Sequence, residues 1–309
     1  MMKPLISVVI RTLNEEKYLE ELLFSISNQS KNKYRVEVVI VDSGSTDQTL
    51  SIAKKYNSLL TFIKKEDFSF GKSLNVGCNF SNGDYLVFVS GHCIPVHNNW
   101  LENLVSPLED NCGYTYGKQI GRDTTKFSEN QLFEKYFPDQ SKLPQSGFFC
   151  NNANAAIRRD LWSKYKFNEL LTGCEDMELA KRLTENGISI GYVSEAPVFH
   201  IHDETWEQVK IRYERESLAL QQIMPEIYVT RFDVIKFVFV GIVKDAIAAF
   251  KKKKLYKSFY SIIRFRLAQY LGAYHGNHLS RKVSKEMKEK YFYPRVTKMD
   301  LGSSIKKEK

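Results

Sequence analysis

Oxygen-bearing side chains follow two short apolar runs near the start of the chain, residues 5–10 and 36–41. The side chains concerned are Thr12, Asn14, Glu15, Asp42 and Ser43. Such oxygens can accept hydrogen bonds from nucleobase N–H groups and ribose hydroxyls. Helix capping would explain an Asn or a Ser here, but not an acid directly after a buried strand. We therefore predict a nucleotide-binding edge, and the absence of a GxGxxG motif argues against a dinucleotide.

A third polar group, Ser90-Gly91-His92, follows the apolar run 85–89. Imidazole binds manganese and later transition metals, whereas magnesium prefers oxygen ligands. Three interpretations stay open for His92: a metal ligand, a direct donor to a phosphate, or a structural residue. Its position after a buried strand favours a functional role.

Two adjacent acids, Glu175 and Asp176, begin a predicted helix over residues 175–186. The helix dipole and the unpaired N–H groups of a first turn favour an ionised carboxylate. An ionised carboxylate can take the proton from an attacking hydroxyl. Simple capping of the helix is the alternative.

Two histidines, His200 and His202, follow a strand-like segment at residues 197–199. Side chains alternate along an extended chain, so both imidazoles are expected on one face. His200 is the preferred candidate for a ligand. Exposed histidines at a strand end are the alternative.

Strands and helices alternate through the first part of the chain. Apolar runs at residues 5–10, 36–41, 59–63 and 85–89 predict strands, separated by segments with helical periodicity. This order predicts an α/β fold with a mostly parallel sheet flanked by helices. Ligands of such sheets bind outside the carboxyl ends of the strands, where the first three polar groups lie.

Charge is unevenly distributed along the chain, which carries a formal net charge of +9. From residue 205 onward there are 23 Lys and Arg against 10 Asp and Glu, so the remainder is slightly acidic. The five cysteines are odd in number and include no CxxC, which fits a reducing compartment. The sequence predicts neither a signal peptide nor a membrane-spanning run.

The basic C-terminal part has apolar helical periodicity broken by charges. Residues 232–250 are rich in Phe, Val and Ile, and four lysines follow at 251–254. This pattern predicts a helical appendage lying at an anionic membrane surface, where each cation contributes about 1 kcal/mol. A helical pair packed on the rest of the protein is the alternative. Nucleic-acid binding is disfavoured, because no stacking module is recognisable.

Five segments, in this order, resemble the family 2 glycosyltransferases, which have the Rossmann-like GT-A fold. They are VVIRTLNEEKYLEELLFSISNQ, VVIVDSGSTDQT, FSFGKSLNVGCNFSNGDYLVFVSGHCIPVHNNWLENL, NNANAAIRRDLW and FNELLTGCEDMELAKRL. The resemblance covers roughly residues 6–219. It implies transfer of a sugar, with inversion, from a nucleoside diphosphate sugar to a hydroxyl acceptor.

The resemblance also implies residue roles. The donor would be bound by Thr12, Asn14, Glu15, Asp42, Ser43, Lys72, Ser90, Gly91 and His92, with Lys72 near the diphosphate. Asp176 would be the base and Glu175 its supporting acid. Most of the family has Asp-x-Asp, a metal-binding motif, where this chain has Ser90-Gly91-His92. A divalent metal would therefore be held through His92 and His200, with Mn²⁺ favoured over Mg²⁺.

We accordingly predict a catalytic domain at residues 1–222 and a basic, membrane-associated helical tail at 223–309. The enzyme would act in surface polysaccharide or glycolipid synthesis, in the cytoplasm, at the inner face of the membrane. Its acceptor would be a saccharide or a lipid-linked saccharide. A non-catalytic sugar-nucleotide or membrane-binding protein and another nucleotide-using transferase are the alternatives. The second would need a Gly-rich basic loop after the first strand, which RTLNEEKYL does not supply.

Overall fold

The computed structural model describes residues 3–279 and 285–293. Two compact units divide the chain. The first comprises residues up to 125 together with 129–202, and the second comprises 126–128 and the residues from 203 onward. The boundary lies before the helix at 206–223 rather than after it, because that helix packs against a later one. The predicted tail includes residues 280–284 and 294–309, which lie outside the described residues.

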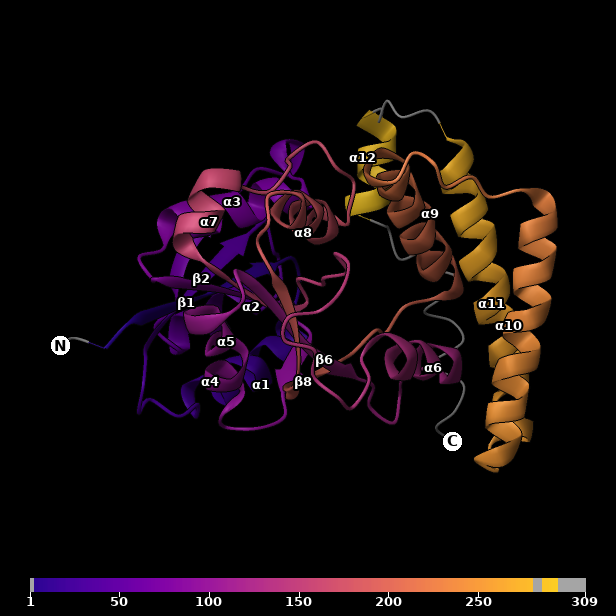
Figure 1. Ribbon diagram of the computed structural model, residues 1–309, viewed down its shortest axis with the longest axis horizontal. Helices are drawn as coiled ribbons and strands as arrows, with labels where there is room; N and C mark the ends of the chain where they lie inside the picture. Colours follow the sequence, from indigo (N-terminus) through magenta and orange to yellow (C-terminus); the bar gives the residue numbers. More distant parts are fainter. Residues whose placement is uncertain (1–2, 280–284, 294–309) are drawn as a thin grey trace. The chain divides into compact units, whose positions relative to one another are not determined.

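The first unit is a sheet with helices on both faces (Figure 1). Its strands are β1 (Leu5–Thr12), β2 (Arg35–Asp42), β3 (Leu59–Phe62), β4 (Tyr85–Val89), β5 (Cys93–Pro95), β6 (Tyr114–Ile120), β7 (Asn154–Arg158) and β8 (Ile190–His200). Its helices are α1 (Glu16–Ser27), α2 (Thr49–Lys55), α3 (Phe70–Phe80), α4 (Trp100–Val105), α5 (Pro107–Asp110), most of α6 (Phe127–Tyr136), α7 (Arg159–Tyr165) and α8 (Glu175–Glu185), with a 3₁₀ turn at Lys65–Asp67.

The strands form one sheet in the order β3-β2-β1-β4-β7-β6-β8-β5. The pairs β1–β2, β1–β4, β2–β3 and β6–β8 are parallel, while β7 runs antiparallel to both neighbours and β5 runs antiparallel to β8. The predicted α/β fold with a mostly parallel sheet is therefore confirmed. Because β1 lies between β2 and β4, the chain reverses its direction of winding at β1, and a crevice forms there at the carboxyl edge.

Burial on both faces explains why the central strands are apolar throughout. Ile6, Val8, Val9 and Ile10 of β1 are all buried, since helices cover the two faces of the sheet. On one face, α3 lies unusually close to the sheet. A Cβ at Gly77 would lie 2.5 Å from a methyl carbon of Val9, so only glycine fits at this contact.

Strand β8 extends the strand-like segment expected at residues 197–199. It begins at Ile190 and forms one continuous strand that ends at His200. Its first part pairs with β6 alone, and its last part pairs with both β6 and β5, with an irregularity opposite Gly117–Gln119 of β6. This continuous pairing carries His200 to the carboxyl edge of the sheet.

The second unit is helical, with α9 (Trp206–Ile223), α10 (Arg231–Lys251), α11 (Leu255–His278) and α12 (Lys285–Phe292). Capping boxes begin α9 at Thr205 and α10 at Thr230. Gly272 and Gly276 of α11 let its backbone approach α9: a Cβ at Gly276 would lie 2.0 Å from the Glu214 carbonyl oxygen.

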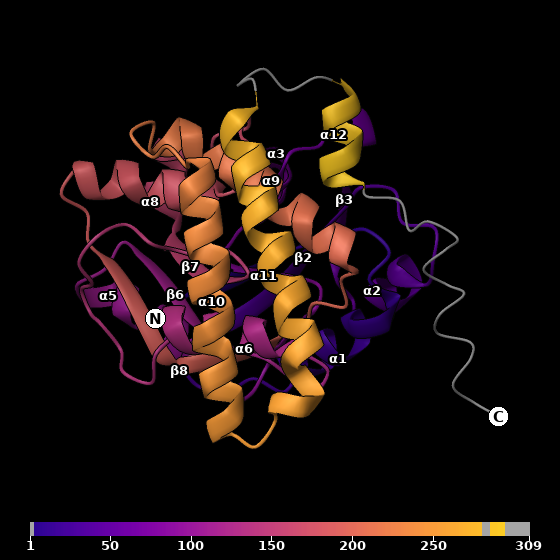
Figure 2. The same cartoon turned by 90° about the vertical axis from the view of Figure 1, so that its right-hand side faces the viewer.

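A buried ion pair joins α10 to α11, which run side by side (Figure 2). Both Arg266 nitrogens Nε and Nη2 donate to the Asp245 carboxylate at 2.8 Å, and both side chains are almost fully buried. A buried Arg–carboxylate pair of this kind tolerates little sliding of one helix along the other, so it fixes their register.

The opposite side of α10 carries an exposed apolar stripe. Its members recur every three or four residues: Phe232, Ile235, Phe239, Val243, Ile247 and Phe250. Phe232, Phe239 and Phe250 are exposed to 85%, 68% and 72% of their surface. We call these six residues the α10 stripe. Among the described residues, none of the helices combines the length and apolar character that crossing a membrane requires.

Candidate active site

The end of β1 and the loop after it contact the polar groups at the ends of β2 and β4 as well as the start of α8. The first contact is with β2, whose end is in register with that of β1, with Thr12 opposite Asp42. The Thr12 hydroxyl donates to the Asp42 carboxylate at 2.9 Å, and the Ser43 hydroxyl donates to the Thr12 carbonyl oxygen at 3.2 Å. The predicted grouping of these side chains at one edge is thus present.

Asp42 organises the loop that follows it. Its carboxylate also accepts hydrogen bonds from the N–H groups of Gly44 and Ser45, both at 2.9 Å, and from the Ser45 hydroxyl. Gly44 adopts a φ of 103°, a conformation that favours glycine. Asp42 is only 1% exposed, so its buried carboxylate stabilises the conformation of the loop that follows it.

Asn14 and Ser45 join the β1 and β2 loops instead of capping helices. The Asn14 N–H donates to the Ser45 hydroxyl at 2.8 Å, and the Asn14 side-chain oxygen accepts from the Thr46 N–H at 2.9 Å. Helix α1 begins at Glu16 and α2 begins at Thr49, neither with a side-chain cap. Asn14 itself has a φ of 55°, in the left-handed region.

The second contact of the β1 loop crosses the crevice between β1 and β4. Glu15 Oε1 lies 3.1 Å from Nδ1 of His92. Gly91 makes room for this pair, because a Cβ there would lie 2.9 Å from Cγ of Glu15. Ser90 contributes backbone contacts to the same turn, with its carbonyl oxygen accepting from the Cys93 N–H.

His92 belongs to a cluster of three imidazoles. Its ring centroid lies 5.4 Å from that of His200 and 5.8 Å from that of His202, and the last two are 4.0 Å apart. One ring nitrogen from each histidine lies within 4.8 Å of the others, so these residues fit a metal that accepts imidazole. The expectation that His200 and His202 share one face agrees with this geometry, although His200 is buried instead of exposed.

The third contact, made by Arg11 near the end of β1, reaches the start of α8. Arg11 donates to Glu175 Oε1 at 3.1 Å and to the Phe70 carbonyl oxygen at 3.1 Å. Glu175 is buried, and its partner guanidinium neutralises it. Arg11 was not among the residues predicted from the sequence. A cation at the end of a buried strand was the available signal.

Asp176 lies next to this ion pair and is held by two backbone N–H groups. Oδ2 accepts from Asn152 at 2.7 Å and Oδ1 accepts from Met177 at 2.7 Å. Burial, and then the negative charge of Glu175, raise the pKa of Asp176 to about 7. The sequence predicts that the helix terminus keeps this carboxylate ionised, which would lower its pKa. The pKa is raised instead, because desolvation outweighs the hydrogen bonds from the N–H groups.

Two neutral groups, the Tyr114 hydroxyl and the Cys150 thiol, also lie near Asp176. Burial raises the pKa of the Tyr114 hydroxyl and of the Cys150 thiol, and the Asp176 charge adds to both shifts. Tyr114 donates to the side-chain oxygen of Asn152, whose N–H in turn binds Asp176. These residues orient the carboxylate and keep it in a weakly polar setting. Neither Tyr114 nor Asn152 was predicted from the sequence.

Lys72 lies in the first turn of α3. Its ammonium group pairs with Asp67 at 3.1 Å and is partly exposed. Ser69 caps this helix by accepting from the Lys72 N–H at 3.1 Å. The structure thus gives Lys72 a local acidic partner, and its predicted role at the diphosphate stays a prediction.

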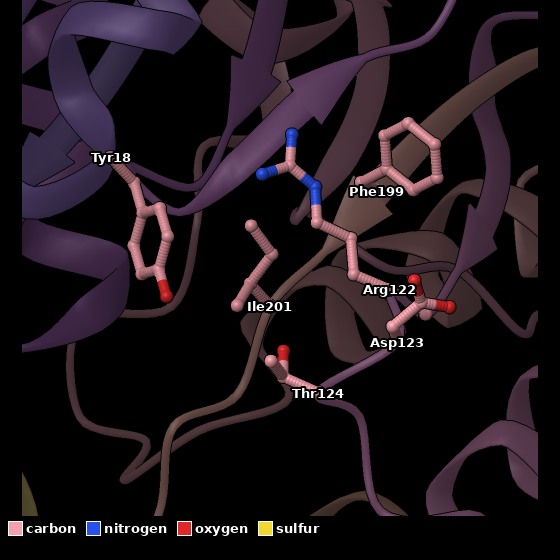
Figure 3. A pocket seen from close by; sticks show the side chains of 7 residues that line it. Tyr18, Arg122, Asp123, Thr124, Phe199 and Ile201 are labelled. Atoms are coloured by element: carbon pink, nitrogen blue, oxygen red, sulfur yellow. The ribbon is translucent and has the colours of Figure 1, made fainter. Parts of the chain in front are cut away.

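The first unit has a pocket of about 530 Å³ (Figure 3). One of its lining residues, Ile201, lies between His200 and His202 in the sequence. Its lining residues are Tyr18, Gly121, Arg122, Asp123, Thr124, Phe199 and Ile201. The Arg122 guanidinium lies 5.0 Å from the Phe199 ring centre and pairs with Glu21. Aromatic walls with charged and hydroxyl groups between them suit a ligand with apolar faces and polar edges.

Comparison with known families gives a match over more than half of the chain. Residues 7–166 match the family described as glycosyl transferase family 2. An uncharacterized glycosyltransferase of Haemophilus influenzae is 34% identical over 231 residues, which cover 69% of this chain and 71% of that protein.

Two further relatives carry names that specify more. Glycosyltransferase AglE of Haloferax volcanii is 29% identical over 61% of this chain and 64% of its own length. The O-antigen chain rhamnosyltransferase WbaN of Salmonella anatum is 29% identical over 60% of this chain and 62% of its own length. The chain therefore matches somewhat less than two thirds of the length of either.

Solved structures share the fold. The mannosyltransferase PcManGT from Pyrobaculum calidifontis, in complex with GDP-Man and Mn²⁺, has a TM-score of 0.62 at 17% identity, covering 88% of this chain and 86% of its own. Glucosyl-3-phosphoglycerate synthase from Mycobacterium tuberculosis, with Mn²⁺, UDP-glucose and phosphoglyceric acid, has a TM-score of 0.52 at 20% identity, covering 71% and 80%. The fold is thus of the GT-A type, and with the family match over residues 7–166 and the Haemophilus relative, the chain belongs to glycosyl transferase family 2.

Proposed function

We propose that this protein is an inverting glycosyltransferase that moves a sugar from a nucleoside diphosphate sugar to a hydroxyl of a saccharide or lipid-linked acceptor. One observation carries the proposal: residues 11–15, at the end of β1 and in the loop after it, contact Asp42, His92 and Glu175. The sequence assigns these three to the nucleoside, the metal and the acid that supports the base. One short segment thereby links donor binding to the residue next to the proposed base.

The donor would lie along the edge formed by the β1, β2 and β4 ends. Hydrogen bonds hold the loops after β1 and β2, which would bind the nucleoside, in fixed positions. They are made by Thr12, Asn14, Asp42 and Ser43. Glu15 would bind the nucleoside, and the turn Ser90-Gly91-His92 would face the diphosphate, with Lys72 as a cation near it. Fixed loops favour binding, because less conformational entropy is lost when the donor binds.

Asp176 would act as the general base. Its carboxylate would take the proton of the acceptor hydroxyl while that oxygen forms a bond to the anomeric carbon. The bond from this carbon to the diphosphate oxygen breaks at the same time, and the nucleoside diphosphate leaves with the electron pair. A pKa of about 7 suits this role, because a base works best with a pKa near the operating pH.

A divalent metal would be held through His92 and His200, with Mn²⁺ favoured over Mg²⁺. When bound, such an ion would neutralise charge on the diphosphate. The support is the clustering of the imidazoles and the presence of Mn²⁺ in PcManGT with GDP-Man. Imidazole nitrogen is a poor ligand for magnesium, which explains the direction of the preference.

The second unit would bind the inner face of a membrane and bring the enzyme to a lipid-linked acceptor. The α10 stripe is apolar and exposed, and the four lysines at 251–254 follow it directly. Apolar side chains that insert shallowly and cations that meet anionic head groups are the two requirements of an interfacial helix. The name of WbaN, an O-antigen chain transferase, supports a role in surface polysaccharide synthesis.

Incubation with a panel of UDP-, GDP-, dTDP- and CMP-sugars tests the enzymatic part. Donor-dependent transfer or slow hydrolysis of one nucleotide sugar, lost in Asp176→Asn, is the expected result. Stabilisation by a nucleotide sugar without turnover would instead indicate a non-catalytic binder. A ligand at 100 times its dissociation constant stabilises the fold by about 2.7 kcal/mol, which a thermal-shift screen detects.

A further inference from the structure

The three clustered imidazoles come from two places in the chain. His92 follows β4, whereas His200 ends β8 and His202 lies two residues beyond it. Antiparallel pairing of β5 with β8 brings them together, since Cys93 lies opposite His200. The Ile201 N–H also donates to the His92 carbonyl oxygen at 3.2 Å, so the two backbones are joined at the cluster.

Each imidazole makes a hydrogen bond through Nδ1 to a side-chain oxygen. The partners are Glu15 for His92 at 3.1 Å, Gln119 for His200 at 2.6 Å, and Glu129 for His202 at 2.7 Å. An acceptor at Nδ1 places the proton on that nitrogen and makes Nε2 the ligand atom. Three histidines with the same arrangement of outer acceptors are what a built metal site requires.

The packing around the cluster restricts its rings. Gln119 and Glu129 are buried, and Phe133 stacks on His200 with ring centroids 5.8 Å apart. A tetrahedral ion about 2.0–2.1 Å from three nitrogens needs them about 3.4 Å apart. The ring nitrogens lie within 4.8 Å of one another, so they would draw closer by up to about 1.4 Å when an ion binds.

The charges favour a divalent cation although the ligands themselves are neutral. Two of the three outer acceptors, Glu15 and Glu129, are carboxylates. They offset the charge of an ion without coordinating it, as in carboxylate–histidine–metal arrangements. Three nitrogen ligands disfavour magnesium and calcium, which prefer oxygen.

We propose that His92, His200 and His202 form a three-imidazole site that binds a divalent transition metal, such as Zn²⁺, Co²⁺ or Mn²⁺, in the absence of nucleotide. Glu15, Gln119 and Glu129 are positioning residues that act through the rings. The fourth coordination position would face a water or, resting on the proposed function, a diphosphate oxygen of the donor. In this site His202 would coordinate the metal directly, whereas the sequence favoured only His92 and His200 as ligands.

Titration of the metal-free full-length chain with Co²⁺, without nucleotide, tests the site. Saturable binding of one Co²⁺, with visible absorption bands typical of nitrogen coordination, is expected, and Zn²⁺ should displace it. His202→Ala and the closer mimic His202→Gln should each weaken binding at least 100-fold. Glu129→Gln should weaken it about 10–100-fold, as loss of an outer partner does.

His97→Ala is the matched control, since His97 is exposed on the same unit and outside the cluster. It should bind Co²⁺ as the unaltered chain does, and circular dichroism should show all four variants folded. Unchanged Co²⁺ affinity in both folded His202 variants would overturn the three-imidazole site. So would failure of the unaltered chain to bind Co²⁺ without nucleotide, even if it transfers sugar. Binding without any transfer would instead support the site and count against the proposed function.

Discussion

Glu15 and His92 face each other across the crevice between β1 and β4, with 3.1 Å between Oε1 and Nδ1. From the sequence, Glu15 was expected to bind the nucleoside and His92 the metal, as two independent roles. Their contact means that the carboxylate orients the imidazole. A change at either residue is therefore expected to alter both donor affinity and metal response.

Metal preference should follow from the histidine at position 92. We expect magnesium to activate transfer poorly and manganese, or another imidazole-binding metal, to activate it well. His92→Asp should shift the preference toward magnesium, because it supplies an oxygen ligand. Initial rates against the concentration of each metal, after chelation, measure this. Tight activation of the unaltered enzyme by magnesium, unchanged in His92→Asp, would leave His92 a structural residue.

Asp176→Asn should reduce transfer by about 10²–10⁴-fold, because the amide cannot accept a proton. Affinity for the nucleoside diphosphate should stay nearly unchanged. Glu178→Gln is the control on the same helix, since Glu178 pairs with Arg182 within α8. Single-turnover rates and calorimetric titration separate the two effects. Near-normal turnover in Asp176→Asn would remove this residue from the mechanism.

The pH dependence of transfer should reveal the raised pKa of Asp176. The base must be ionised, so kcat/KM should fall tenfold per pH unit below about 7. Glu175→Gln removes the neighbouring charge that raises this pKa, so the acid limb should move to lower pH. An acid limb that does not move, or moves upward, would show that another group controls the rate.

The same shift affects stability in a defined direction. The folded protein holds the Asp176 proton more tightly than the unfolded chain, whose Asp pKa is about 3.9. This group's contribution to the free energy of unfolding should therefore decline as the pH rises from about 4 to 7. Asp176→Asn should flatten that part of a stability profile measured with urea.

Asp42→Ala should weaken binding of the donor while leaving turnover at saturating donor nearly normal. The carboxylate accepts four hydrogen bonds from Thr12, Gly44 and Ser45, so its loss should loosen the β2 loop. Asp84→Ala is the control at the opposite edge of the sheet, where Asp84 accepts from the Leu5 N–H. Calorimetry with the free nucleoside diphosphate measures the effect. Equal affinity in both variants would contradict the assignment.

Replacing Phe232, Phe239 and Phe250 by serine should release the protein from vesicles containing anionic phospholipid. These rings are exposed, so the fold should be unaffected, whereas deleting the chain after Ile223 also removes α11, which packs on α9. Leu170→Ser, equally exposed on the first unit, is the control. Binding should also weaken with salt. Co-sedimentation of the triple variant at the unaltered level would show that the α10 stripe does not meet the membrane.

The first four strands along the chain and the edge where the site lies could be predicted from sequence because both depend on local pattern. Parallel strands end at one edge, so Thr12 and Asp42 were expected together, and they are in register. The partner of Glu175 could not be predicted this way. Arg11 is 164 residues away in the chain, and no periodicity encodes that contact.

The histidine cluster shows a second limit. Alternation along an extended chain predicts that His200 and His202 share a face, but not that β5 pairs with the end of β8 and places them beside His92. The buried acceptors Gln119 and Glu129 lie on other elements, and neither residue type signals such a role by itself. The predicted boundary at 222 likewise followed the end of the family resemblance near residue 219, whereas the packing of α9 on α11 places the division at 203.

Asn14 and Cys174 both adopt left-handed backbone, with φ of 55° and 53°, and each directly precedes an acid of the site. Holding a residue with a side chain in this region costs on the order of 1 kcal/mol. Glycine at either position would relieve that cost and also loosen the acids that follow. Selection for heat resistance alone and selection for turnover alone would therefore favour different residues at these two positions.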